Sequence, residues 1–554
     1  MRRRAPVTFL SLLLIGILHA SGAMADGVPD EQYVPPLPTN GVSVGIFFLD
    51  NLFANVSSVL FASATLQKLD SQFQSTVNQS ACNSYDDEPC TAGTSFDYFA
   101  HLPRCLGPMD TDCIESIFAV NPDGVKVAGV FESEMPEKLS NPFLGEPKLG
   151  IPRPGLDGIW RLPGIINGGG TDQYLVNSVL QGYANKTPGE VLAQPAVLTH
   201  FSAGIFPVKV ISGTYVPSYA FFAVGQNGTK SLSWMHASGN GAEACAAVSS
   251  TACALREAFP SDTAFGLRIR LSQALIGWLH GRLRDPLIDF SSTTGRTNLT
   301  IQALPVSVPV VATWIDRAKL PTVIPGYGPN PSVNVAMNGS AFADGSINIL
   351  KFWIPWVNDT AQANPTEWLV RNMMSSEMRG ADSCMLDSKT LAGVVTTNST
   401  VYSAGPPKFN AETQSLDYTL VSPHYTSKGA VFKGVYTLAI KSEVARCIYH
   451  FTDAPIKATI SITDNSGTSS VAVQSVAEHG GWIYLSASNF EFSSPTVHVK
   501  LMQNAPVSKR SATPQPTATM KPQAKRGTIT CPRRKVSKRV TGLSPKCPAD
   551  FKKK

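Results

Sequence analysis

Ten cysteines, most of them in close pairs, are the feature of this sequence that most restricts its fold. Three pairs have seven intervening residues and two are wider: Cys82 and Cys90, Cys105 and Cys113, Cys245 and Cys253, Cys384 and Cys447, Cys531 and Cys547. An even number of cysteines without a C-x-x-C motif is typical of structural disulfides formed in an oxidising compartment. We therefore expect five bridges between nearest neighbours, although spacing alone leaves other pairings open.

The N-terminus has the three parts of a secretory signal peptide. Three arginines at 2–4 precede an apolar run over 7–18, and the small-residue site that follows predicts cleavage between Ala25 and Asp26. The apolar run is shorter than the roughly 20 residues that span a bilayer. No later segment reaches that length without charges or turn residues. The sequence therefore predicts an exported chain with no transmembrane segment after cleavage.

The C-terminus is strongly basic, whereas the rest of the exported chain is acidic. Residues 506–554 contain fourteen Lys and Arg against one acid, Asp550, although the 554-residue chain as a whole carries a net charge of only +6. With the three N-terminal arginines set aside, residues 26–505 have more acidic than basic side chains. A cationic tail on an acidic exported body predicts electrostatic retention at an anionic surface.

Composition favours a mainly β protein with a few helices. Charged residues make up only 16% of the chain, which also contains 41 Pro and 43 Gly, and this suits short strands joined by turns better than a helical bundle. Alternating apolar residues predict a strand over 265–271, with Arg268 and Arg270 on its outer face. Further strands are expected at 306–310 and at the aromatic run 347–356.

Two stretches have helical patterns instead. Apolar residues at helical spacing predict an amphipathic helix from Leu49 to about Thr76. A second, short helix is expected over 365–376, because Asn364 is a good cap, Pro365 suits the first helical position and Glu367 completes the capping pattern.

The chain is too long for one ordinary domain, and its composition divides it into five segments. We expect a signal peptide (1–25), a β-rich body with a helical, cystine-looped N-terminal part (26–394), a β-sandwich-like domain (395–505), a Pro/Thr-rich linker (506–526) and a basic C-terminal module (527–554). The sandwich is expected because short alternating strands recur about every ten residues between turn residues. The predicted fold class is thus multi-domain, mainly β and disulfide-braced.

The end of the chain resembles a known kind of module. The run Thr528-Ile529-Thr530-Cys531-Pro532 is followed by basic residues, by Pro545-Lys546-Cys547-Pro548 and by Phe551-Lys552-Lys553-Lys554. This pattern is similar to a short Cys-Pro/Lys-rich C-terminal module of uncharacterised secreted and surface proteins of actinobacteria. The strand patterns around Cys447 and Trp482 are similar to the closing domain of proteins in that group. The resemblance implies a location outside the cell and no particular activity.

No local motif predicts catalysis or metal binding. Gly41-Val42-Ser43-Val44-Gly45 matches the nucleophile-elbow pattern, but Ser43 lies too near the start of the exported chain to follow several strands, so a turn and strand are expected. The histidines are scattered, without a His-Glu-x-x-His motif. His236 and His280 are the most site-like, and each is more easily explained as a solvent or core residue. We expect no catalytic residue, no cofactor and no metal.

Two weaker patterns allow alternative functions. Two of the small cystine loops contain acidic residues that could hold calcium, namely Asp86, Asp87, Glu88, Asp110 and Asp112. The regular EF-hand spacing is missing, so solvated acidic loops are the simpler interpretation. Phe352, Trp353 and Trp356 could form an aromatic platform for sugar rings, but core packing is favoured.

The sequence therefore predicts a secreted protein of the cell surface, with an interaction or structural role. Its predicted partner is an anionic cell-envelope polymer or lipid surface, contacted by Arg533, Arg534, Lys535, Lys538, Arg539, Lys546, Lys552, Lys553 and Lys554. No aromatic residues interleave this run, so specific nucleic-acid binding is not expected. The tail could also dock on the acidic body. Alternative functions are an extracellular hydrolase acting on glycan or peptide, and a carbohydrate-binding adhesin.

Overall fold

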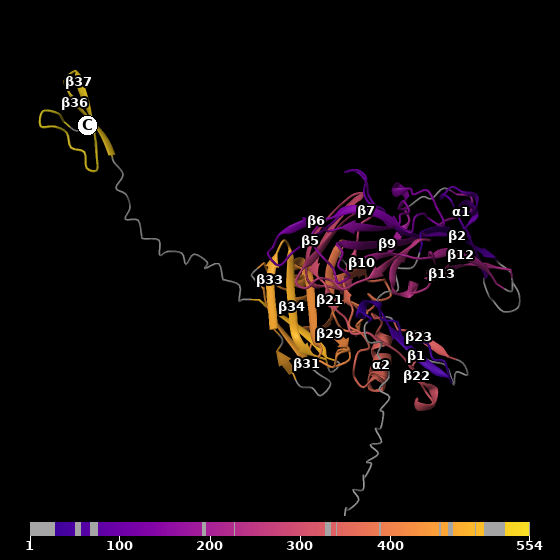
Figure 1. Cartoon of the computed structure of the whole chain (residues 1–554). Helices are drawn as coiled ribbons and strands as arrows, with labels where there is room; N and C mark the ends of the chain where they lie inside the picture. Colours follow the sequence, from indigo (N-terminus) through magenta and orange to yellow (C-terminus); the bar gives the residue numbers. More distant parts are fainter. Residues whose placement is uncertain are drawn as a thin grey trace, which may run out of the picture. The chain divides into compact units, whose positions relative to one another are not determined.

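Short strands make up most of the structure, which is a computed structural model (Figure 1). It describes residues 28–49, 57–66, 76–190, 195–225, 228–326, 334–339, 341–386, 389–453, 456–463, 469–471, 473–492, 495–503 and 527–552. Strand accounts for 52% and helix for 9%, which confirms the mainly β class with a few helices. The signal peptide with its Ala25–Asp26 cleavage site lies outside the described residues, as do the whole predicted linker (506–526), Lys553 and Lys554.

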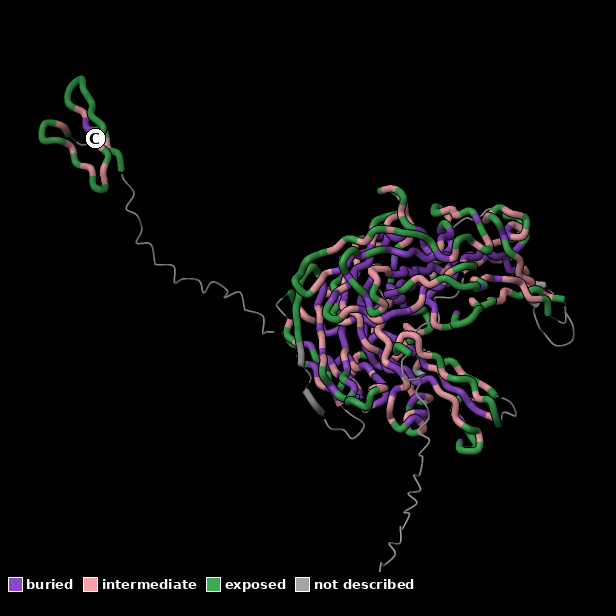
Figure 2. The backbone as a smooth tube through the Cα atoms, in the orientation of Figure 1, coloured by how far each residue is buried: buried purple, intermediate pink, exposed green. Residues whose placement is uncertain are grey.

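The chain separates into two units. The first contains Met1–Phe451 and Lys457–Met502, and the second contains Thr452–Ile456 and Gln503–Lys554. Figure 2 shows buried residues running through the strands of the first unit, whereas the C-terminal segment 527–552 of the second is mostly exposed.

A 15-stranded sheet is the largest element of the first unit. Along its main path the strands are β3 (Thr76–Ala81), β2 (Val59–Leu66), β4 (Ser95–His101), β9 (Gln173–Asn185), β10 (Val197–Ser212), β25 (Leu369–Asn372), β18 (Gly277–Arg282), β26 (Leu391–Thr397), β30 (Lys433–Lys441), β34 (Trp482–Glu491) and β33 (Val473–His479). Four strands lie off this path: β7 (Val130–Met135), β8 (Asp157–Arg161), β15 (Cys245–Val248) and β16 (Ala252–Arg256). The pairing of β18 with β26 is parallel, and the other neighbours along the main path are antiparallel.

A five-stranded antiparallel sheet packs against this sheet. Its strands, in order, are β19 (Arg284–Thr293), β20 (Arg296–Leu304), β17 (Ala264–Leu271), β5 (Cys113–Val120) and β6 (Lys126–Ala128). The largest hydrophobic core lies between the two sheets, with Phe265, Leu267 and Ile269 from β17 and Phe201 from β10. The buried Trp368 indole joins the layers, since its Nε1 donates to the Ala303 carbonyl at 3.1 Å.

Smaller sheets complete the strand inventory. A six-stranded sheet contains β27 (Val401–Tyr402), β28 (Lys408–Asn410), β29 (Ser415–Val421), β35 (Thr496–Gln503), β31 (Ile456–Thr463) and β32 (Ser469–Val471). A three-stranded sheet contains β22 (Val311–Asp316), β1 (Ser43–Phe48) and β23 (Val335–Asn338). The paired strands are β11 (Tyr215–Val216) with β14 (Ser238–Gly239), β12 (Tyr219–Val224) with β13 (Lys230–Met235), β21 (Val306–Ser307) with β24 (Thr366–Glu367), and β36 (Gly527–Arg533) with β37 (Val536–Gly542).

Helices are few and short. The α-helices are α1 (Glu88–Ala92), α2 (Asp344–Trp353), α3 (Ser383–Leu386) and α4 (Ser442–Tyr449), and the 3-10 turns are η1 (Asp30–Gln32), η2 (Pro147–Leu149), η3 (Ala242–Ala244), η4 (Arg317–Lys319) and η5 (Ile354–Val357). Among the described residues, none of these helices is long and apolar enough to cross a membrane.

The amphipathic helix predicted from Leu49 to about Thr76 is wrong wherever the structure describes that stretch. Residues 59–66 form β2, which is paired with β3 on one side and β4 on the other. Val59, Leu60, Phe61 and Ala62 are all buried. Because both faces of the strand are covered, its apolar residues do not alternate, and a continuous apolar run does not distinguish a buried strand from a helix.

The predictions for 347–356 and 365–376 are also wrong: the predicted strand is helical, and the predicted helix contains strands. The first stretch is helical (α2 and η5), with Leu350, Trp353 and Val357 on one face buried against β1 and β22. The second stretch contains β24 and β25, because β25 is paired between β10 and β18. Its expected cap, Asn364, instead accepts a hydrogen bond from the Ser427 amide at 2.7 Å. Pairing of β25 with the distant strands β10 and β18 has therefore outweighed the helix-capping pattern of the local sequence.

Strands from the predicted body and from the predicted sandwich share one sheet. β26 spans the expected 394/395 boundary and joins β18 to β30. The six-stranded sheet packs against this end of the large sheet. The Tyr418 ring of β29 is 5.6 Å from that of Tyr436 on β30, and the Tyr449 hydroxyl of α4 donates to the Val499 carbonyl of β35.

A cluster of basic side chains lies inside the first unit. Arg282 is fully buried and donates to the carbonyls of Ser399 and, at 3.0 Å, Thr400. Arg371 is ion-paired with Glu377, and its guanidinium lies 3.5 Å from the centre of the Phe342 ring. The two guanidiniums are thus held by carbonyls, one carboxylate and aromatic rings.

Two buried histidines lie near these arginines and are neutral at pH 7. Burial lowers the pKa of His200 to about 4, and the charge of Arg371 contributes to the shift. Burial likewise lowers the pKa of His280 well below its usual value, with Arg371 and Arg282 adding to the effect. Protonating either imidazole in the folded state would place a new charge in a site that is already cationic.

We expect His200 to make the protein less stable in acid. Below pH 6.5 the unfolded chain protonates this histidine, whereas the folded chain does not do so until about pH 4, so its contribution is present above pH 6.5 and is lost as pH falls towards 4. Replacing it in His200→Gln should reduce the difference in unfolding free energy between pH 7 and pH 4 by about 3 kcal/mol. Urea titrations at the two pH values measure this.

The matched control is His236→Gln, because His236 is exposed. Its pH dependence should equal that of the unmodified protein. If both variants kept the full pH dependence, His200 would not be a source of acid sensitivity.

Candidate functional site

The basic C-terminal module is a disulfide-closed β-hairpin. β36 pairs with β37 through a tight turn, in which Arg533 is opposite Val536 and Arg534 has a positive φ of 48°. Cys531 is bonded to Cys547 and is fully buried. A segment of this size cannot build much of a hydrophobic core, so the disulfide is the main constraint on its shape.

The predicted surface-binding cations of this module are exposed. Those within the described residues are Arg533, Arg534, Lys535, Lys538, Arg539, Lys546 and Lys552. Lys538 lies opposite Cys531, and Arg539 lies opposite Thr530. These adjacent positions point to opposite faces of the hairpin. Charge therefore surrounds the module and is not confined to one face.

Little of this charge is neutralised within the module. Among residues 527–552 the single acid, Asp550, lies 3.3 Å from Arg533, and both side chains are well exposed. An exposed ion pair of this kind contributes about 1 kcal/mol at most. The other cations of residues 527–552 are exposed as well.

Five disulfides join the pairs that the cysteine spacing predicts. They are Cys82–Cys90, Cys105–Cys113, Cys245–Cys253, Cys384–Cys447 and Cys531–Cys547. Five bridges indicate an oxidising, extracellular environment.

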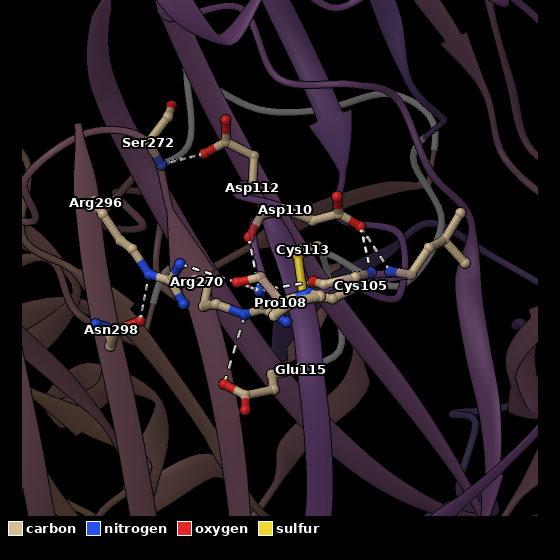
Figure 3. Close-up of a disulfide and its surroundings, with 12 residues drawn as sticks. Cys105, Pro108, Asp110, Asp112, Cys113, Glu115, Arg270, Ser272, Arg296 and Asn298 are labelled. Atoms are coloured by element: carbon tan, nitrogen blue, oxygen red, sulfur yellow. Dashed lines mark hydrogen bonds and ion pairs between the residues drawn. A yellow bond between two sulfur atoms is a disulfide. The ribbon is translucent and has the colours of Figure 1, made fainter.

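The Cys105–Cys113 loop is held from inside by an arginine (Figure 3). Nη1 of Arg270 donates to the carbonyls of Gly107, Pro108 and Asp110 at 2.9, 2.7 and 3.0 Å. Arg270 was expected on the outer face of its strand, and this is wrong, since it is 5% exposed. The loop covers the side chain and supplies the acceptors that make its burial tolerable.

The acidic residues of the cystine loops bond to the protein itself. Asp110 accepts from the amides of Leu106 and Gly107 at 2.7 and 2.9 Å, and these bonds lower the pKa of its carboxyl. Asp112 is buried, which raises its pKa, and accepts from the Ser272 amide at 2.8 Å. In the other loop, Asp87 accepts from the Asn83 amide at 2.9 Å. These contacts give three of the five acidic residues, Asp87, Asp110 and Asp112, a role in shaping the loops, which supports the simpler interpretation.

The structure places the remaining candidates from the sequence either in cores or at the surface. Ser43 begins β1 as expected and is buried. His236 is exposed and His280 lies in the core. Trp353 is fully buried, and Phe352 and Trp356 pack partly against the same cluster. Trp353 is therefore a core residue, as expected, whereas Phe352 and Trp356 are only partly buried.

A buried histidine–aspartate pair could not be found from the sequence. Nδ1 of His101, at the end of β4, lies 2.7 Å from Oδ1 of Asp157, at the start of β8. Asn177 donates to the same carboxylate oxygen at 2.9 Å. The Ser58 hydroxyl accepts from the His101 amide at 3.0 Å and donates to the Gly155 carbonyl at 3.1 Å. Segments far apart in the sequence meet here, so no local pattern could indicate the pair.

Two adjacent hollows lie beside this pair and the Cys105–Cys113 loop. The outer pocket has a volume of about 270 Å³ and is lined by Pro103, Arg104, Leu106, Glu134, Leu139, Arg153, Pro154, Gly155 and Leu156. The inner cavity, about 20 Å³, is lined in part by Ser58, His101 and Asp157. Leu139, Gly155 and Leu156 line both. The inner cavity has room for about one water molecule.

Comparison with models of protein families, with curated proteins and with solved structures finds no match to this chain.

We expect Arg270→Ala to destabilise the protein by about 2–4 kcal/mol, because it leaves several carbonyls of the loop without a donor. The unfolding free energy from urea titration measures the loss. Arg296→Ala is the control: this side chain also donates to the Pro108 carbonyl, at 2.9 Å, but in an exposed setting. Its cost should be below about 1 kcal/mol. Equal losses for the two variants would show that Arg270 does not hold the loop.

Proposed function

We propose that this is a secreted protein of the cell envelope, retained there by its basic hairpin, with an interaction or structural role. The observation that carries the proposal is the exposure of seven cations against one acid on the disulfide-closed segment 527–552. The hairpin's partner is an anionic surface, either a cell-envelope polymer or lipid headgroups. The resemblance of this segment to the C-terminal module of actinobacterial surface proteins supports the same location.

The physical basis of retention is the sum of several weak attractions. Each Lys or Arg close to an anionic lipid surface contributes about 1 kcal/mol before screening. Exposed charges are screened within about 8 Å at physiological ionic strength. Retention by this hairpin should therefore be reversible and sensitive to salt.

The alternatives have less support. Of the aromatic residues that suggested a carbohydrate-binding adhesin, Trp353 is fully buried in a core, whereas Phe352 and Trp356 are only partly buried. A hydrolase on glycan or peptide would need a nucleophile or a pair of carboxylates placed around a cleft. The His101–Asp157 pair supplies an oriented imidazole, and the serine hydroxyl beside it contacts backbone groups.

We predict that the hairpin binds anionic vesicles and that its charges are responsible. The full-length protein should co-sediment with vesicles of 30% phosphatidylglycerol in phosphatidylcholine at low salt, and should be released as salt rises. Lys535→Gln, Lys538→Gln and Arg539→Gln together should weaken binding at least tenfold. The control combines Lys148→Gln, Lys319→Gln and Lys351→Gln, exposed lysines of the first unit, and removes the same charge.

An equal loss in both triple variants would show that net charge, and not the hairpin, drives binding. Binding that resists salt, or that persists on pure phosphatidylcholine, would contradict an electrostatic anchor. If vesicles fail but isolated cell walls retain the protein with the same salt sensitivity, the partner is a polymer and not the lipid.

A further inference from the structure

The outer pocket combines apolar walls with two guanidinium groups. Leu106, Leu139 and Leu156 supply apolar surface, and Arg104 and Arg153 supply charge. Both arginines are exposed. Within the described part of the chain, neither forms an ion pair with a carboxylate. Positive charge beside an apolar wall is a common pattern of a small-molecule site.

Arg104 is held in position although it is exposed. The centre of its guanidinium lies 4.5 Å from the centre of the Phe131 ring. Stacking of this kind leaves the N–H groups at the edge of the guanidinium plane available to a ligand. The planar group can then receive a carboxylate through two parallel hydrogen bonds.

Two parts of the pocket wall are braced by bonds within the protein. Leu106 is 68% exposed, yet it belongs to the loop that Arg270 and the Cys105–Cys113 disulfide hold. Opposite, Gly155 donates its amide hydrogen to the His101 carbonyl at 2.7 Å. A Cβ at Gly155 would lie 2.4 Å from the Pro103 nitrogen, so only glycine allows the two segments to approach this closely. A preformed site loses less entropy when a ligand binds.

Size and charge limit the ligand. A volume of about 270 Å³ suits a small molecule rather than a polymer chain. The lining also contains one carboxylate, Glu134, which opposes an anion. Two cations line the pocket against this single acid, although Arg153 also interacts electrostatically with Asp110 outside the lining.

We propose that the outer pocket binds a small apolar carboxylate, with its carboxylate at Arg104 and Arg153 and its apolar part against Leu106, Leu139 and Leu156. This site belongs to the first unit and is independent of the basic hairpin and of the function proposed for it.

Calorimetric titration of the full-length protein tests the site, with octanoate, octanol and acetate as probes. Octanoate should bind at least tenfold more tightly than either octanol, which lacks the charge, or acetate, which lacks the apolar chain. Arg104→Gln with Arg153→Gln should weaken octanoate binding at least tenfold. Glu134→Gln should strengthen it, because the opposing charge is removed. Arg104, Arg153 and Glu134 are all exposed. The urea midpoint of unfolding of each variant should therefore equal that of the unmodified protein.

Arg379→Gln is the matched control. Arg379 is also exposed and lines a different pocket, of about 370 Å³, so the substitution should leave octanoate binding unchanged. Octanol binding as tightly as octanoate, no effect of the Arg104 and Arg153 substitutions, or an equal effect of Arg379→Gln would each overturn the proposal. The hairpin variant Lys535→Gln, Lys538→Gln and Arg539→Gln should bind octanoate normally, which separates this site from the anchor.

Discussion

The parallel pairing of β18 with β26 joins the two halves of the first unit, and the large sheet depends on it. On the β18 side of this pairing the strands come from residues 59–282, except for β25 (Leu369–Asn372), and from β26 onwards they come from residues 391–491. The fully buried Trp278 of β18 lies over Gly393 of β26, where a Cβ would be 2.2 Å from the ring. Arg282, at the end of β18, donates to carbonyls that follow β26. Close packing and buried hydrogen bonds therefore act at the same junction.

The cystine loops were the part of the fold that sequence spacing predicted best. Disulfides between near neighbours need little information from the rest of the chain, and all five bridges follow the nearest-neighbour rule. Alternation also predicted β17 correctly, although not the burial of Arg270, which depends on a loop about 160 residues earlier in the sequence. The errors at 49–76, 347–356 and 365–376 share a cause: in each, pairing or packing with distant strands decided the local structure.

The two candidate sites differ in how much the sequence could reveal. The exposed cations of the hairpin are visible as a run of basic residues, since exposure is the expected state of Lys and Arg. The outer pocket is not visible, because its walls come from segments around 103–106, 134–139 and 153–156. The approach of Gly155 to Pro103 and the His101–Asp157 contact appear only in the fold.

We propose that the first unit binds a small ligand in its outer pocket and that the basic hairpin of the second unit retains the chain at the cell envelope. Retention is the central claim, and it is tested most directly in the producing cell. Full-length protein and a chain ending at residue 505 would be measured in the cell pellet and in the medium across a salt series. The account predicts that the full-length chain stays with the pellet at low salt and is released as salt rises, while the shortened chain is in the medium throughout. Equal partition of the two chains would contradict it.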